Sequence, residues 1–174
     1  MSKQPTEPKP QAKPRTPSLT RQLTDVEEAN LAFYEAFNKC DVERMEKLWA
    51  QSPYVRCIHP GWEPVVGWPS VRQSWADVFE SMLSIDFSLE DVHVEVVGQS
   101  ARVNLVAHAS VTTIDNDVFQ TSVVATTIMD KIENEWLIVL HHSSHLLEDD
   151  SDLEQLDGFT ASLPYTNDGS SQPN

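Results

Sequence analysis

Residues 56–79 read RCIHPGWEPVVGWPSVRQSWADVF, and the rest of the chain is organised around this stretch. It contains a short apolar segment typical of a strand, a His-Pro-Gly turn and the first turns of an amphipathic helix. Three tryptophans, Trp62, Trp68 and Trp75, fall within it. We interpret the stretch as the mouth of a pocket with a helix folded over it.

Local signals predict three helices, two before this stretch and one within it. Thr24 and Glu27 have the spacing of a capping box, which predicts that the first helix begins at Thr24. Asp41 is a typical N-cap for a second, short helix. Pro69 suits the first turn of a third helix, because no hydrogen bond is lost there with its missing N–H group.

The second half of the chain changes to the two-residue period of strands. A short strand is predicted over residues 54–59. Alternating or β-branched runs predict four more, over residues 87–97, 101–114, 118–130 and 135–145, separated by hairpin-like breaks. The sequence therefore predicts an α+β fold, with three helices gathered on one face of a curved, mostly antiparallel sheet.

Composition divides the 174 residues into three parts. Residues 1–22 are basic and proline-rich, and residues 147–174 contain seven acidic and no basic residues. Both ends lack the apolar content that would offset the entropy of ordering them, so we expect disordered tails. The remaining 23–146 is expected to form a single domain.

The net charge of −15 argues against several classes of partner. A strongly acidic body is repelled by phosphate backbones and anionic membranes, so we expect no nucleic acid and no membrane partner. No apolar run has the length of a signal peptide core or a membrane span. The only two cysteines, Cys40 and Cys57, carry no mark of a disulfide pair, which favours a reducing, cytoplasmic location.

The order of these elements resembles the SnoaL-like domains of the NTF2-like superfamily. Three segments carry the resemblance, which covers roughly residues 24–146: FYEAFNKCDVERMEKLW, CIHPGWEPVVGWPSVRQSW and WLIVLHHSSH. The resemblance implies a cone in which helices and a curved sheet enclose an apolar pocket. It also implies a homodimer built by packing sheet against sheet.

The superfamily includes ketosteroid isomerase and the polyketide cyclases, and the isomerase motif can be compared position by position. Its oxyanion-binding tyrosine matches Phe33, which has no hydroxyl, so that role is vacant unless the adjacent Tyr34 takes it. Its general base matches His59, and histidine can act as a base near neutral pH. Its third residue, an acid, falls near Thr126 and Thr127, where no carboxyl group is present. Isomerase chemistry is therefore not implied.

His59 and Tyr34 are accordingly the candidate catalytic residues, and His59 has a structural alternative as a half-buried histidine bonded to backbone at a strand end. The candidate pocket residues are Phe33, Phe37, Trp62, Trp75, Phe79, His108 and His142. The aromatic residues among them have ordinary core packing as the alternative, and His108 lines either a wet cavity or the solvent-facing side of its strand.

His141, His142 and His145 do not predict a metal site. On a strand His142 points away from the other two, and no recognised ligand spacing is present. One of His141 and His142 is expected to line the cavity. Glycine-rich phosphate loops are absent as well, and we expect neither a metal nor a cofactor.

Three functions stay open. The first is binding of a small, largely apolar molecule in the cone, which suits a pocket that combines aromatic rings with a few histidines. The second is a cofactor-independent isomerase, cyclase or dehydratase with His59 as the acid–base group. The third is a homodimeric protein-interaction module whose pocket is filled by its own side chains. Fold by itself does not choose among them.

Overall fold

The computed structural model describes residues 18–146, so both predicted tails, apart from residues 18–22, lie outside the described residues. Within this range the elements follow the order α1 Leu19–Asn38, α2 Val42–Glu46, β1 Arg56–Ile58, β2 Val65–Val66, α3 Trp68–Glu80, β3 Met82–Val97, β4 Ser100–Thr113, β5 Val118–Ile132 and β6 Glu135–His145. The three helices all precede the four long strands β3–β6, and only the short β1 and β2 lie between α2 and α3, which agrees with the predicted α+β plan. The domain limits at residues 23 and 146 stay predictions.

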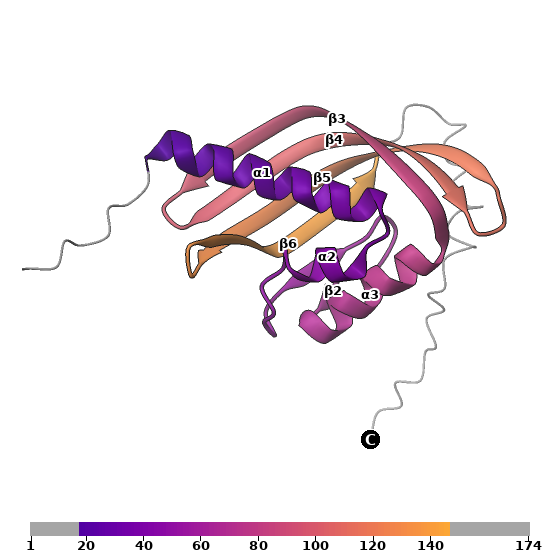
Figure 1. Cartoon of the computed structure of the whole chain (residues 1–174), viewed down its shortest axis with the longest axis horizontal. Helices are drawn as coiled ribbons and strands as arrows, with labels where there is room; N and C mark the ends of the chain where they lie inside the picture. Colours follow the sequence, from indigo (N-terminus) through magenta and orange to yellow (C-terminus); the bar gives the residue numbers. More distant parts are fainter. Residues whose placement is uncertain (1–17, 147–174) are drawn as a thin grey trace, which may run out of the picture.

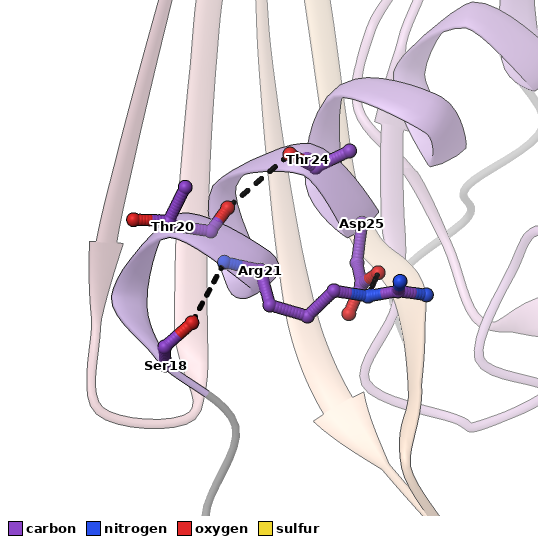
Figure 2. A network of polar contacts seen from close by, with 5 residues as sticks. All are labelled: Ser18, Thr20, Arg21, Thr24 and Asp25. Carbon is purple, nitrogen blue, oxygen red and sulfur yellow. Dashed lines mark hydrogen bonds and ion pairs between the residues drawn. The ribbon is translucent and has the colours of Figure 1, made fainter.

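Helix α1 begins earlier than predicted. Its N-cap is Ser18, whose hydroxyl accepts a hydrogen bond from the backbone N–H of Arg21 at 3.3 Å (Figure 2). Thr24 lies inside the helix, where its hydroxyl donates to the carbonyl of Thr20 at 3.2 Å. Arg21 also pairs with Asp25 one turn further on, at 2.7 Å. The prediction of an N-cap at Thr24 is therefore wrong, and residues 19–22, assigned to the tail, are helical.

The other two helices begin as predicted. The side chain of Asp41 caps α2 by accepting from the backbone N–H of Arg44 at 2.9 Å. Helix α3 begins at Trp68 with Pro69 in its first turn. One face of α3 is buried, and it carries the apolar side chains Val71, Trp75, Val78 and Phe79.

Six strands form a single sheet in the order β2-β1-β6-β5-β4-β3. Only the β1–β6 pair is parallel, and hairpins join β3, β4, β5 and β6 in sequence. Strand β1 is shorter than the predicted 54–59, and the two-residue β2 was not predicted. Figure 1 shows α1 lying along one face of the curved sheet, with α2 and α3 near one end.

The core lies between the helices and this face of the sheet, which we call the inner face. On β4 the buried residues alternate with more exposed ones, so that Ala107, Ala109 and Val111 face inward while His108 and Ser110 face outward. The opposite, outer face carries no described helix (Figure 1). No helix within residues 18–146 is long and apolar enough to cross a membrane.

Candidate functional site

A cavity of about 80 Å³ lies between α1, α3 and the inner face of the sheet. Among the described residues, the phenylalanine and tryptophan rings of its wall are Phe33, Phe37, Trp62, Trp75, Phe87 and Phe119. Its polar side chains are Tyr34, His59, Thr121, His141 and Ser143. None of the residues that line it in the described part of the chain is Asp, Glu, Lys or Arg. An apolar wall with a few polar groups is the usual composition of a small-molecule pocket.

His59 directly follows β1 and is held by groups on two sides. Its ring lies 4.9 Å from Trp62 and 4.7 Å from Trp75, centroid to centroid, and is only 5% exposed. Its Nε2 atom lies 3.0 Å from the hydroxyl oxygen of Ser74 on α3 and 3.6 Å from the sulfur of Cys57. Burial disfavours the charged imidazolium and lowers the pKa of His59 to about 4. The imidazole is therefore neutral at pH 7.

His141 on β6 is the second buried histidine of the cavity. It is 3% exposed, its ring lies 4.7 Å from that of Phe33, and its Nδ1 atom lies 3.0 Å from the hydroxyl of Thr127. Burial is the main reason that its pKa falls to about 3, and the nearby His59 and His142 lower it further. Two neutral imidazoles thus contribute hydrogen-bonding groups without charge.

Tyr34 and Cys57 are also kept neutral at this site. Tyr34 packs edge-on against Phe33 at 5.1 Å and Phe87 at 5.0 Å, and burial raises the pKa of its hydroxyl above the ordinary value. Burial likewise raises the pKa of the Cys57 thiol. A thiol held in the protonated form is a poor nucleophile, so the geometry offers proton donors and acceptors rather than an activated sulfur.

The structure brings most of the predicted site residues together. His59, Tyr34, Phe33, Phe37, Trp62 and Trp75 all line the cavity. Trp62 lies in the loop after β1 and is only partly buried, whereas Trp75 contacts both histidines from α3. Of residues 56–79, which we interpreted as the mouth of a pocket with a helix folded over it, the cavity is lined by His59, Pro60, Trp62, Trp75 and Val78.

Three predicted pocket residues lie elsewhere. Phe79 is buried behind the wall, with its ring 5.5 Å from Phe37 and 5.7 Å from Trp75. His108 is on the outer face, where its Nδ1 atom lies 2.8 Å from the hydroxyl of Ser122. His142 is exposed on the same face. The placements of His108 and His142 follow from strand alternation, because Ala109 and His141 take the inward positions next to them.

The sequence left open which of His141 and His142 lines the cavity, and a β-bulge decides for His141. Phe87, Phe119, Thr121 and Ser143 also line it and were not predicted. Trp136 and Ile138 face the core, so strict alternation would turn Leu140 and His142 inward as well. A register shift opposite Ile128 and Met129 inserts one extra residue after Ile138 and reverses this order. No sequence signal marked this bulge.

The described residues contain no group of three His, Cys, Asp or Glu side chains that could hold a metal ion. The histidines also divide between the two faces of the sheet, with His59 and His141 on the inner side and His142 on the outer side.

Comparison with known proteins points to one family. The family model described as SnoaL-like domain matches residues 26–148. The F-box protein SKIP8 of Arabidopsis thaliana is 30% identical over 133 residues. The 133 aligned residues make up 76% of this chain and 53% of the F-box protein, so the chain spans about half the length of this relative.

Solved structures give the same result. A candidate dehydratase of the NTF2-like family from Streptomyces avermitilis is 31% identical, with a TM-score of 0.69 over 75% of this chain and 99% of that one. A candidate calcium/calmodulin-dependent protein kinase II association domain from Thiobacillus denitrificans is 27% identical, with a TM-score of 0.60 over 70% and 94% of the two chains.

Proposed function

Because this chain belongs to the SnoaL-like domain family of the NTF2-like superfamily, we propose that it binds a small, largely apolar, uncharged molecule in the cavity under α1 and α3. The observation that carries the proposal is the composition of the wall, which combines aromatic rings with neutral polar groups and contains no Asp, Glu, Lys or Arg among residues 18–146. Such a wall favours apolar contact area and disfavours a charged ligand, whose lost hydration nothing would replace.

The size of the cavity restricts the ligand. Its 80 Å³ is smaller than the roughly 150 Å³ that accommodates benzene in an engineered protein cavity. A ring-sized molecule therefore requires the wall to move or extends past the mouth. Trp62 lies in the loop between β1 and β2 and is only partly buried, so it belongs to the less enclosed part of the wall.

The test uses two neighbours on β4 that face opposite ways. Ala109 lines the cavity, and Ser110 lies on the outer face. Ala109→Leu should fill the cavity and abolish binding of small apolar probes, measured by the fluorescence of the cavity tryptophans and by calorimetry. Ser110→Leu adds similar bulk outside and should leave binding unchanged. Equal binding by the two variants, or no binding of any probe to the wild type, would overturn the proposal.

A second candidate function is acid–base catalysis, which the 31% identity to a candidate dehydratase favours. His59 and Tyr34, the predicted catalytic residues, both line the cavity and carry groups that could move a proton. Native mass spectrometry of protein purified from its host would detect any retained molecule. Catalysis requires that His59→Gln still binds this molecule but no longer converts it. Equal conversion by both proteins would exclude this function for His59.

A third candidate function is that of a protein-interaction module. Such a module would form a homodimer by packing through the outer face of the sheet. On this face Val106 pairs with Val124 across neighbouring strands, and Val124 is 41% exposed. The 27% identity to a candidate association domain also favours an assembly.

We also propose a cytoplasmic location for the protein, because Cys40 and Cys57 are both unpaired.

A further inference from the structure

The tautomer of His59 follows from the two hydrogen bonds of Ser74. The Ser74 hydroxyl donates to the backbone carbonyl of Val71 at 2.8 Å, and the same oxygen lies 3.0 Å from Nε2 of His59. A serine hydroxyl has one hydrogen, and a carbonyl oxygen can only accept. Both bonds form together only if Nε2 carries a proton and donates it to the serine oxygen. The sulfur of Cys57, at 3.6 Å, is a second, weak acceptor for the same proton.

This arrangement leaves Nδ1 of His59 without a proton. A neutral imidazole has one N–H donor and one acceptor nitrogen, so Nδ1 keeps its lone pair. Among residues 18–146 the structure gives Nδ1 no hydrogen-bond partner. His59 lines the cavity, and because its Nε2 atom is already bonded to Ser74, we infer that Nδ1 is the nitrogen left to a molecule bound there.

We propose that Ser74 holds His59 in the Nε2–H tautomer, and that the cavity therefore selects an uncharged molecule carrying a hydroxyl or N–H group that donates to Nδ1. This inference deepens the proposed function and rests on it for the ligand. A ligand without a donor would leave a buried acceptor unpaired, which is unfavourable. A carboxylate would bring a second acceptor to Nδ1 and would find no Lys or Arg among the described residues of the wall.

The first measurement needs no ligand. Long-range ¹H–¹⁵N NMR correlations of the imidazole rings, recorded on the free protein at pH 7, identify which nitrogen of His59 is protonated. We expect the proton on Nε2 in the wild type. In Ser74→Ala the preference should weaken, giving a mixture of tautomers, and Ser74→Thr should restore it. A proton found on Nδ1 in the wild type would overturn the role of Ser74, whatever the variants do.

The chain offers a matched control for Ser74. Ser81, at the end of α3, donates to the carbonyl of Val78 at 2.6 Å, which is the same bond to the residue three positions earlier. It does not line the cavity. Ser81→Ala therefore removes an equivalent hydroxyl at the C-cap of the same helix and should leave the His59 tautomer unchanged. A change of tautomer in Ser81→Ala would show that Ser74→Ala acts through the helix in general, which would overturn a specific role for Ser74.

The second measurement compares phenol with toluene, which are nearly equal in size and differ in the donor. Titrations followed by NMR should give phenol about tenfold tighter binding in the wild type and in Ser81→Ala. In Ser74→Ala the preference should shrink through weaker phenol binding, with toluene unchanged. Equal affinities in the wild type would overturn the ligand class. If neither phenol nor toluene binds, both the proposed function and the proposed ligand class are wrong. The NMR assignment of the protonated nitrogen of His59 then still tests the role of Ser74 by itself.

Discussion

The two faces of the sheet use the same residue types in different surroundings. On the inner face, His141 pairs with the hydroxyl of Thr127 at 3.0 Å, and both side chains are buried. On the outer face, His108 pairs with the hydroxyl of Ser122 at 2.8 Å, and Glu90 lies 3.4 Å from its other nitrogen. The distances are alike, but the outer pair is partly open to solvent.

The difference shows that burial, more than hydrogen-bond geometry, determines how much free energy is lost when one of these pairs is broken. Water can replace a lost partner on the outer face, whereas a buried imidazole nitrogen without a partner stays unpaired. Burial also keeps the inner histidines neutral, as the lowered pKa values of His59 and His141 indicate. The inner face is therefore suited to recognition of a neutral ligand, and the outer face to contact with another surface.

The largest expected effect on stability comes from removing the ring of Trp75, which lies among the aromatic residues on the inner side of the sheet. Trp75 is 1% exposed and lies within 5.5 Å of the rings of Phe33, Phe37 and His59. Trp75→Ala should lower the free energy of unfolding by about 3–5 kcal/mol, measured by chemical denaturation, because it leaves a cavity. The exposed Tyr54 is the control, and Tyr54→Ala should stay within about 0.5 kcal/mol of the wild type. Similar losses in both variants would contradict the inner-side packing.

The pH dependence of stability tests the buried histidines. The pKa of His59 is about 4 in the folded protein and about 6.5 when the chain unfolds, so the unfolded state binds the proton first. Stability from this group is complete above about pH 6.5 and is lost as the pH falls towards 4. The expected slope is about 1.4 kcal/mol per pH unit for each such histidine. Denaturation of the wild type and His59→Gln should therefore differ in slope across this window.

The exposed His142 provides the control for this experiment. His142→Gln makes the same change on the outer side of β6, next to His141. The free energy of unfolding of His142→Gln should follow the wild-type pH profile more closely than the free energy of unfolding of His59→Gln does. If His59→Gln and the wild type lose stability in parallel between pH 6.5 and 4, the buried, neutral state of His59 is wrong.

A matched pair of hydroxyl deletions compares the faces directly. Thr127→Val leaves Nδ1 of the buried His141 without its partner and should lower stability by about 1–3 kcal/mol. Ser122→Ala makes the same change for His108, where solvent can substitute, and should lower it by less than about 1 kcal/mol. Thermal and chemical denaturation of both variants measure the difference. A larger loss for Ser122→Ala would mean that the outer face is covered in solution.

The smallest expected effect concerns the outer face as a dimer surface. Val124→Lys places a charge at an exposed apolar position and should raise the dimer dissociation constant about tenfold, which is about 1.4 kcal/mol. Val66→Lys, on the edge strand β2, is the control and should leave the constant unchanged. Analytical ultracentrifugation measures both. A wild type that stays monomeric, or a dimer insensitive to Val124→Lys, would contradict the proposed dimer.

Much of the fold could be predicted because its signals are local. Asp41 caps a helix and Pro69 starts one, as their backbone preferences predict. The breaks near Gly98, Asn116 and Asn134 became hairpin turns, and each of these residues has the positive φ that such turns use. The start of α1 was mispredicted because Thr24 and Glu27 form a capping pattern inside a helix that Ser18 already caps.

The sequence by itself determined the order of the elements, the α+β class and the aromatic and histidine content of residues 56–79. Only the tertiary structure decided which of His141 and His142 reaches the cavity, because a bulge that depends on pairing between β5 and β6 reverses the alternation. It also brought Ser74 to His59 across 15 positions of the chain. Periodicity and capping report neighbours along the chain, whereas contacts between a helix and a strand end depend on how the elements pack.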